Sequence, residues 1–175
     1  ESEWVWVGQN KDQVSGTRKD LQLELIERMM VERLIIRTGR GWAFTQAQFR
    51  ECVLRGAKDA GRWVEHHLTC AFAVQEQVRT GSDWERLGRH LLEAGIAHEA
   101  LPALAKGIRW RETTGALRRA MTLLALYEQA LTVDSRAQND RRWEWLWGKR
   151  ATLMWQLGHR RESQFWLDKA IQLAR

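Results

Sequence analysis

Apolar residues recur every three or four positions along most of the chain, which is the spacing of amphipathic helices. The first such stretch begins at Thr17. The period changes over residues 34–45, where the runs Leu34–Thr38 and Trp42–Phe44 flank the glycine-containing connection Gly39-Arg40-Gly41. Such β-branched and aromatic runs on either side of a glycine connection predict a short β-hairpin.

Helical spacing returns after the hairpin. Thr45 and Gln48 have the spacing of a capping box and predict a helix that ends near Gly56. A further helix is predicted from about Arg62 to Arg79. The residues expected to face inward are Phe49, Val53 and Cys52 on the first of these helices, and Val64, Leu68, Ala71, Phe72 and Val74 on the second. The order helix, hairpin, helix is that of the closing half of a winged-helix module.

Beyond Thr80-Gly81 the pattern predicts successive helices. Ser82 and Glu85 have capping-box spacing, and Gly95, Gly115 and Gly158 each separate two amphipathic stretches. A small residue follows each of these glycines by five positions: Ala100, Ala120 and Ser163. Because close helix crossings require small side chains at fixed places, this recurrence predicts stacked helical hairpins.

These positions resemble the tetratricopeptide repeat, W-x2-L-G-x2-Y followed by a turn and A-x3-F. The first unit supplies Trp84, Leu87, Gly88, Leu91, Gly95, Ala100, Leu104 and Gly107, and the last supplies Trp147, Ala151, Met154, Gly158, Ser163, Leu167 and Ala170. The middle is irregular, with Ala120, Leu124 and Tyr127 forming a second half only. A generic helical bundle remains the alternative. Together with the helix, hairpin, helix order, the resemblance predicts a mainly α fold. It consists of a winged-helix-like segment with one β-hairpin over residues 1–80 and a tetratricopeptide-like α-hairpin array (an α-solenoid) over residues 81–175. With no polar capping helix after Ala174, the last helix is expected to expose an apolar face.

A second resemblance covers the segment Gly41–Glu51, which is similar to the F-x-H-x-x-x-R-E stretch of bacterial STAND-type signalling ATPases. Gln46 stands where a histidine is commoner in that family. There the stretch lies near the end of the ATPase module, before tetratricopeptide-like repeats, and the family is often fused to serine/threonine kinase domains. The resemblance implies a regulatory fragment of a larger signalling ATPase or kinase. The chain itself contains no G-x4-G-K-[ST] phosphate loop.

Composition narrows the class of protein. The 175 residues are 44% hydrophobic, which excludes a disordered tail, and no apolar run approaches the length of about 18 residues that a membrane span needs. Two cysteines are too few for a disulfide framework and fit a reducing, cytoplasmic compartment. Residues 1–80 hold 12 basic and 11 acidic residues, whereas residues 81–175 hold 16 and 11. The excess positive charge therefore belongs to the second half.

Catalytic and metal chemistry find little support in the sequence. His66, His67 and Cys70 lie at helical spacing, but no second pair of ligands completes a zinc site, so a buried cysteine beside a packing histidine is the preferred interpretation. His98-Glu99 does not begin an H-E-x-x-H motif, because Pro102 occupies the position of the second histidine. We therefore expect no enzyme activity and no cofactor.

The candidate binding residues are basic doublets and one tryptophan: Arg118, Arg119, Arg141, Arg142, Lys149 and Trp145. On a helix Trp143 and Trp147 share one face, so Trp145 points elsewhere and is expected to be partly exposed, within reach of Arg141 and Lys149. The alternative is that a further helix of the same chain covers Trp145. We expect a protein–protein interaction and regulatory module. Its partner would be a protein, an acidic peptide or a neighbouring domain of the parent chain. We expect no membrane binding, and a homodimer is an option. The alternative is a nucleic-acid-binding module that uses the wing at Gly39–Gly41, and a solvated face is the default for isolated doublets.

Overall fold

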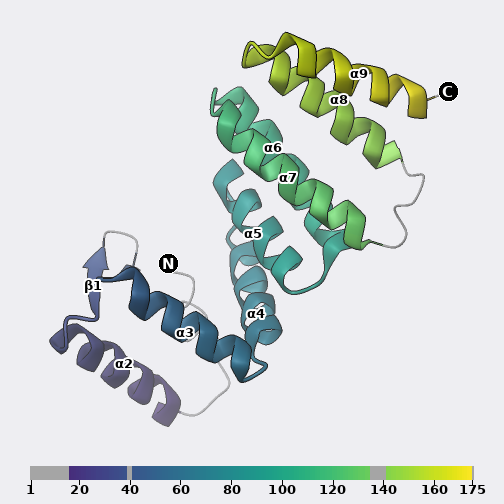
Figure 1. Ribbon diagram of the computed structural model, residues 1–175. Helices are drawn as coiled ribbons and strands as arrows, with labels where there is room; N and C mark the ends of the chain where they lie inside the picture. Colours follow the sequence, from purple (N-terminus) through teal and green to yellow (C-terminus); the bar gives the residue numbers. More distant parts are fainter. Residues whose placement is uncertain (1–15, 39–40, 135–140, 175) are drawn as a thin grey trace. The chain divides into compact units, whose positions relative to one another are not determined.

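The computed structural model describes residues 16–38, 41–134 and 141–174 (Figure 1). The described chain is mainly helical with one antiparallel pair of short strands, as the sequence predicts. Contacts divide the chain into two compact units, Glu1–Glu76 and Gln77–Arg175, hereafter the N-terminal and C-terminal units. In the described ranges, no helix is both long enough and apolar enough to cross a membrane. The domain boundary predicted at residue 80 stays a prediction.

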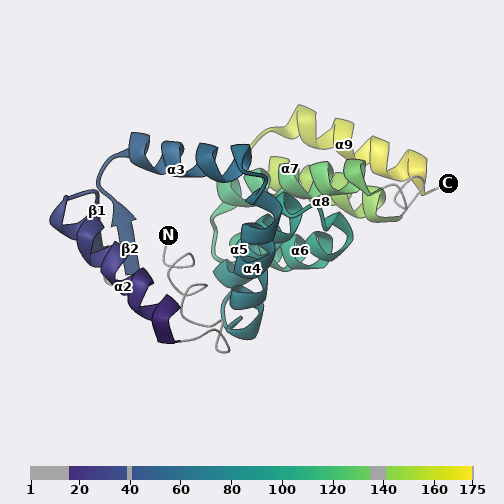
Figure 2. The same ribbon diagram turned by 90° about the horizontal axis from the view of Figure 1, so that it is seen from below.

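The N-terminal unit contains the predicted hairpin. Its elements are α2 (Gly16–Val31), β1 (Ile35–Thr38), β2 (Gly41–Phe44), α3 (Ala47–Asp59) and α4 (Trp63–Glu76), and Figure 2 shows both strands beside α2. Ile35 pairs with Phe44 and Thr38 with Gly41, which confirms the hairpin. The connecting Gly39 and Arg40 lie outside the described residues. The winged-helix assignment stays a prediction.

Thr45 does not begin α3 as a capping residue, which corrects the prediction. Its hydroxyl donates to the carbonyl oxygens of Arg33, at 2.7 Å, and Leu34, at 3.1 Å. The helix begins at Ala47 after Gln46, which makes no side-chain cap, and it continues through Gly56 to Asp59. Thr45 therefore fastens the open end of the hairpin, because those two carbonyls directly precede β1.

The predicted inner face of α3 is wrong, and that of α4 is confirmed only in part. Phe49, Val53, Val64 and Phe72 are 37%, 54%, 49% and 65% exposed, and Cys52 is exposed as well. On α4, Ala71 and Val74 are buried as predicted, together with His67, Cys70 and Ala73, whereas the buried residue of α3 is Ala57. Helix α4 carries apolar residues around most of its circumference, so its periodicity could not decide which stripe is buried.

The C-terminal unit is a series of helices separated by glycine turns. Its helices are α5 (Gly81–Glu93), α6 (Ala97–Thr113), α7 (Leu117–Val133), α8 (Arg141–Gln156) and α9 (Arg160–Leu173). Gly95, Gly115 and Gly158 have φ angles of 78°, 74° and 86°, the left-handed region that glycine enters without steric cost. The three predicted turn glycines are thus confirmed. The structure shows a helical array, and its description as a tetratricopeptide solenoid stays a prediction.

Close packing of α5 against α6 depends on two glycines. A Cβ at Gly88 would lie 2.7 Å from Leu104, and a Cβ at Gly107 would lie 3.2 Å from the backbone of Glu85. Leu87, Leu91, Ala100, Leu101, Leu104 and Ile108 fill the core beside this crossing. The small residues let the two backbones approach, which the sequence pattern predicts for this pair.

Helices α7 to α9 continue the array. Leu124, Tyr127 and Leu153 are buried, and the Ser163 hydroxyl of α9 donates to the Ala151 carbonyl of α8 at 2.8 Å. Leu167, placed in the core by the repeat register, is 43% exposed, which corrects that assignment. Together with Phe165 and Ile171, at 60% and 44%, it gives α9 the exposed apolar residues expected of the last helix.

Candidate functional site

The predicted binding residues lie on two different helices of the C-terminal unit. Arg118 and Arg119 belong to the first turn of α7, whereas Arg141, Arg142, Trp145 and Lys149 belong to α8. The two groups differ in their contacts and are described separately.

On α8 most of the predicted positive charge is already balanced. Lys149 Nζ lies 2.9 Å from Glu112 Oε2 on α6, and Arg142 Nη1 lies 3.3 Å from Asp134 Oδ2. Arg141 is exposed. The doublet partner of Lys149, Arg150, is also engaged, because its Nη2 lies 2.6 Å from Glu128 Oε2 of α7. These contacts tie α8 to α6 and α7 rather than leaving its cations available to a ligand.

Trp145 is half-buried, and its ring packs at a centroid distance of 4.8 Å against Tyr127 of α7. Trp143 and Trp147 share the other face, with centroids 5.8 Å apart, as the helical spacing predicts. Lys169 Nζ of α9 lies 4.4 Å from the Trp147 ring centroid. Because Tyr127 of α7 packs against its ring, Trp145 is held in place while part of its side chain stays accessible.

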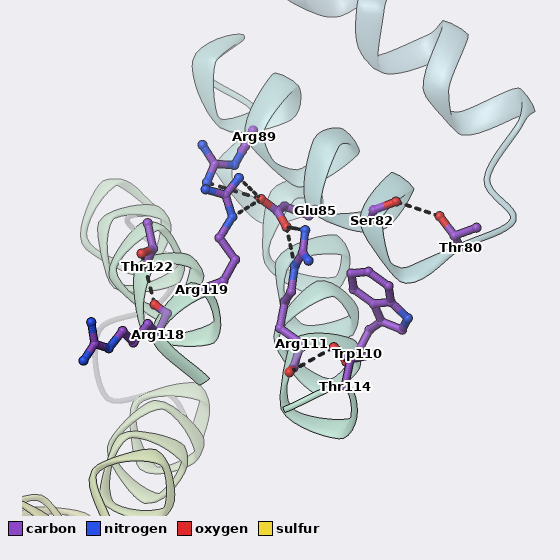
Figure 3. Close-up of polar contacts among 10 residues, drawn as sticks. All are labelled: Thr80, Ser82, Glu85, Arg89, Trp110, Arg111, Thr114, Arg118, Arg119 and Thr122. Atoms are coloured by element: carbon purple, nitrogen blue, oxygen red, sulfur yellow. Dashed lines mark hydrogen bonds and ion pairs between the residues drawn. The ribbon is translucent and has the colours of Figure 1, made fainter. Parts of the chain in front are cut away.

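A different cluster centres on Glu85 of α5 (Figure 3). The Glu85 side chain is 4% exposed, and both of its oxygens accept hydrogen bonds from arginines of other helices. Arg111 Nε donates to Oε2 at 2.9 Å, and Arg119 Nε donates to Oε1 at 2.8 Å. Arg119 Nη2 donates a second hydrogen bond to Oε1, and Arg111 Nη2 lies 2.8 Å from Oε2 in an ion pair. Arg89 Nη2 lies 3.4 Å from Oε1. We call Glu85, Arg89, Arg111 and Arg119 the arginine cluster.

Local sequence explains how each member is positioned. Glu85 and Arg89 are four residues apart on α5 and so share a face. Arg111 lies in the last turn of α6, and Arg119 lies in the first turn of α7, on either side of the Gly115 turn. Gly107 brings the α6 backbone to Glu85, which lets a carboxylate on α5 reach both arginines.

The predicted capping box at Ser82 and Glu85 is wrong. The residues that form it are Thr80 and Asp83: the Thr80 backbone N–H donates to Asp83 Oδ2 at 2.9 Å. Burial raises the pKa of Asp83, but hydrogen bonds from Thr80 and from the Arg79 backbone together lower it by more. The net pKa therefore lies below its usual value. Helix α5 begins at Gly81, earlier than the sequence suggested, and this shift frees Glu85 for the cluster.

The cluster holds three guanidinium groups and one carboxylate. Burial raises the pKa of Glu85, but hydrogen bonds and charge from Arg119 and Arg111 outweigh it, so the net pKa is lowered and Glu85 is ionised at neutral pH. Burial, followed by the charge of Arg119, lowers the pKa of Arg89. Arginine nevertheless stays protonated in proteins, so a formal excess of two positive charges remains.

Access to the cluster is uneven. The side chains of Arg111, Arg89 and Arg119 are 23%, 37% and 49% exposed. Among the described residues, Arg89 Nε and Nη2 are buried atoms without a hydrogen-bond partner, and Nη2 has only the 3.4 Å ion pair with Glu85 Oε1. Unsatisfied buried donors are costly and call for an explanation.

Sequence reasoning found Arg119 but missed Glu85, Arg89 and Arg111. Glu85 and Arg119 are 34 residues apart and belong to different helices, and Glu85 and Arg111 are 26 residues apart. Neither separation is a local helical spacing, so no short-range signal in the sequence links the carboxylate to its arginines.

Other titratable groups of the described residues do not form a metal site. No group of three histidine, cysteine, aspartate or glutamate side chains there could hold a metal ion. His67 packs its ring 4.4 Å from that of Trp63, and burial raises the pKa of the Cys70 thiol to about 11. In comparisons with known proteins, no family model, no curated protein and no solved structure matches this chain.

Proposed function

We propose that the C-terminal unit is a tetratricopeptide-like interaction module that binds an acidic segment of a partner protein, without catalysing a reaction. The observation that supports this most is the arginine cluster, where three guanidiniums share one buried carboxylate and remain 23–49% exposed. Arg118, next to Arg119 in the first turn of α7, adds a further exposed cation. Arginine is enriched in protein interfaces, where its planar donors match carboxylates.

The context of this module follows from the resemblance of Gly41–Glu51 to STAND-type proteins. We propose that it is a regulatory fragment of a bacterial signalling ATPase or kinase and acts in the cytoplasm. The acidic segment would then belong to a separate protein or to a neighbouring domain of the same parent. Trp145 adds a half-buried aromatic surface on α8, and tryptophan often dominates binding energy at interfaces. The apolar residues exposed on α9 would suit a second copy of the chain or a continuing helical array.

The test measures, by fluorescence anisotropy, the binding of a fluorescein-labelled glutamate-rich peptide to the full chain at low and at high salt. We expect binding that weakens as salt rises, and no binding of a lysine-rich peptide of equal length. Trp145→Ala is expected to weaken binding, whereas Trp155→Ala, which removes a tryptophan that is 60% exposed on the same helix, serves as the matched control. Equal affinity for both peptides would refute the proposal.

Duplex DNA in the same assay tests the nucleic-acid alternative. The wing residues Gly39 and Arg40, on which that alternative relies, lie outside the described residues. Duplex affinity above that for the acidic peptide, with a steep dependence on salt, would favour the alternative.

A further inference from the structure

The charge of the arginine cluster exceeds what one carboxylate of a partner would neutralise. Glu85 offsets one of the three guanidinium charges, which leaves a formal excess of two. A glutamate or aspartate side chain carries one negative charge. A phosphate monoester carries about 1.5 to 2 negative charges at neutral pH and three strong acceptor oxygens. Its charge is therefore the closer match.

The donors that Glu85 does not use are also suited to a multi-oxygen anion. A guanidinium has five N–H donors, and the Glu85 contacts of Arg111 and Arg119 involve only Nε and Nη2 of each side chain. The Nη1 group of each arginine is not engaged by Glu85. Glu85 thus acts as a positioning residue, since it fixes the two guanidinium planes while leaving part of each for a ligand.

Two further observations favour the binding of an anion at the arginine cluster. Arg89 Nε is a buried donor with no hydrogen-bond partner among the described residues, and Arg89 Nη2 makes only the 3.4 Å ion pair with Glu85 Oε1, beside the guanidinium of Arg119 (Figure 3). The first turn of α7 holds Arg118 and Arg119 but no acidic residue. Because the N-terminus of a helix carries partial positive charge, cations there are unfavourable and a bound anion would relieve them.

We propose that the arginine cluster is the binding site for a phosphorylated side chain of the partner protein. This inference rests on the proposed function, because it assigns a chemical class to the acidic segment that the module binds. Arg89, Arg111 and Arg119 supply the donors, and Glu85 holds them in place. Phosphorylation of the partner would switch the interaction on by adding charge where a serine has none.

The experiment compares three fluorescein-labelled peptides of one acidic sequence that carry phosphoserine, glutamate or serine at the centre. The 175-residue chain is titrated into each peptide. We expect the phosphoserine peptide to bind at least about tenfold more tightly than the glutamate peptide, which corresponds to about 1.4 kcal/mol. Inorganic phosphate should compete with the phosphoserine peptide, and sodium chloride at equal ionic strength should compete less.

Two variants locate the effect. Arg119→Gln and Arg89→Gln should each remove the preference for phosphoserine, and Arg89→Gln has the smaller risk of unfolding because its single contact with Glu85 is the long one, at 3.4 Å. The matched control is Arg109→Gln, which removes one exposed arginine from the same helix as Arg111 and should retain the preference. Thermal unfolding of each variant verifies that it is folded.

The outcomes separate this inference from the proposed function. Equal affinities for the phosphoserine and glutamate peptides, or a preference that survives both cluster variants, would overturn the phosphate site while leaving acidic-peptide binding intact. Failure of all three peptides to bind would overturn both. Competition by inorganic phosphate without any preference among the peptides would show an adventitious ion only, and would also overturn the inference.

Discussion

Substituting Glu85 with glutamine tests the electrostatic organisation of the arginine cluster directly. Glutamine has nearly the same shape as glutamate, so the packing of α5 against Gly107 is preserved while the negative charge is lost. Glutamine keeps one acceptor oxygen, but its amide nitrogen is a donor. That nitrogen cannot accept the hydrogen bonds that the carboxylate oxygen in its place now receives. Three guanidiniums would then face each other without a counter-charge.

The expected cost is about 2–3 kcal/mol in the free energy of unfolding. Removing one partner of a fully buried ion pair costs about 3–5 kcal/mol, because the remaining charge stays buried and unpaired. Here the carboxylate is 4% exposed but the arginines are 23–49% exposed, so water can hydrate them in part. The loss of stability in Glu85→Gln should therefore be smaller than that for a fully buried ion pair. It should exceed the effect of about 0.5 kcal/mol or less that is typical of surface substitutions.

The assay is chemical denaturation followed by circular dichroism, repeated from pH 7 to pH 3. The folded-state pKa of Glu85 lies below its usual value of 4.5, so its contribution is fully present above that value and is lost as the pH falls through the folded-state pKa. The difference in stability between Glu85→Gln and the unsubstituted chain should accordingly be constant above about pH 5.5 and shrink in acid.

A double-mutant cycle supplies the control. Combining Glu85→Gln with Arg119→Gln should cost less than the sum of the two single effects, because both remove the same interaction. A stability loss below 0.5 kcal/mol for Glu85→Gln, or a loss that does not change between pH 7 and pH 3, would refute the assignment of Glu85 as the counter-charge.

Three other predictions rest on single residues. Gly88→Ala should destabilise the chain by about 1–3 kcal/mol, because the added Cβ would lie 2.7 Å from the Leu104 side chain of the facing helix. Gly148→Ala, which places a Cβ in open space within a helix, should instead stabilise the chain by about 0.5–1 kcal/mol. Thermal unfolding of the two variants compares these effects. A thiol-reactive dye should modify one cysteine of the native chain, the exposed Cys52, because the Cys70 thiol is buried with a pKa of about 11; two equivalents of dye consumed at once by the native chain would contradict this. Burial and the nearby Arg86 lower the pKa of His90 from 6.5 to about 4. As the pH falls from 6.5 to 4, this histidine therefore binds a proton in the unfolded chain before it does so in the folded chain, and the stability should decrease. In His90→Gln, whose side chain does not titrate, this part of the decrease should be absent.

Much of the fold could be predicted from short-range patterns. The hairpin followed from apolar runs on either side of a glycine connection, and the register of Ile35 with Phe44 agrees with it. Gly95, Gly115 and Gly158 marked helix ends because a positive φ angle costs glycine little, whatever lies around it. Gly88 was assigned to a close crossing, and the structure places it against Leu104.

The candidate site could be predicted only in part. Arg119 was identified as one member of a basic doublet, but the same criterion selected Arg142 and Lys149, which form ion pairs with Asp134 and Glu112. Sequence counts charges without showing which are balanced. Balance depends on pairs that lie far apart in sequence and meet only where helices cross.

By itself, the sequence determined the class of structure: helices, one hairpin, and the glycines at which helices end, all of which depend on interactions within a few residues. Tertiary structure decided which face of α4 is buried and which arginines surround Glu85. Helix α4 is apolar on several sides, and Glu85 meets Arg111 and Arg119 across 26 and 34 residues. Both outcomes depend on how helices pack, because burial and ion pairing need atoms to approach within a few ångströms, and local periodicity does not fix that approach.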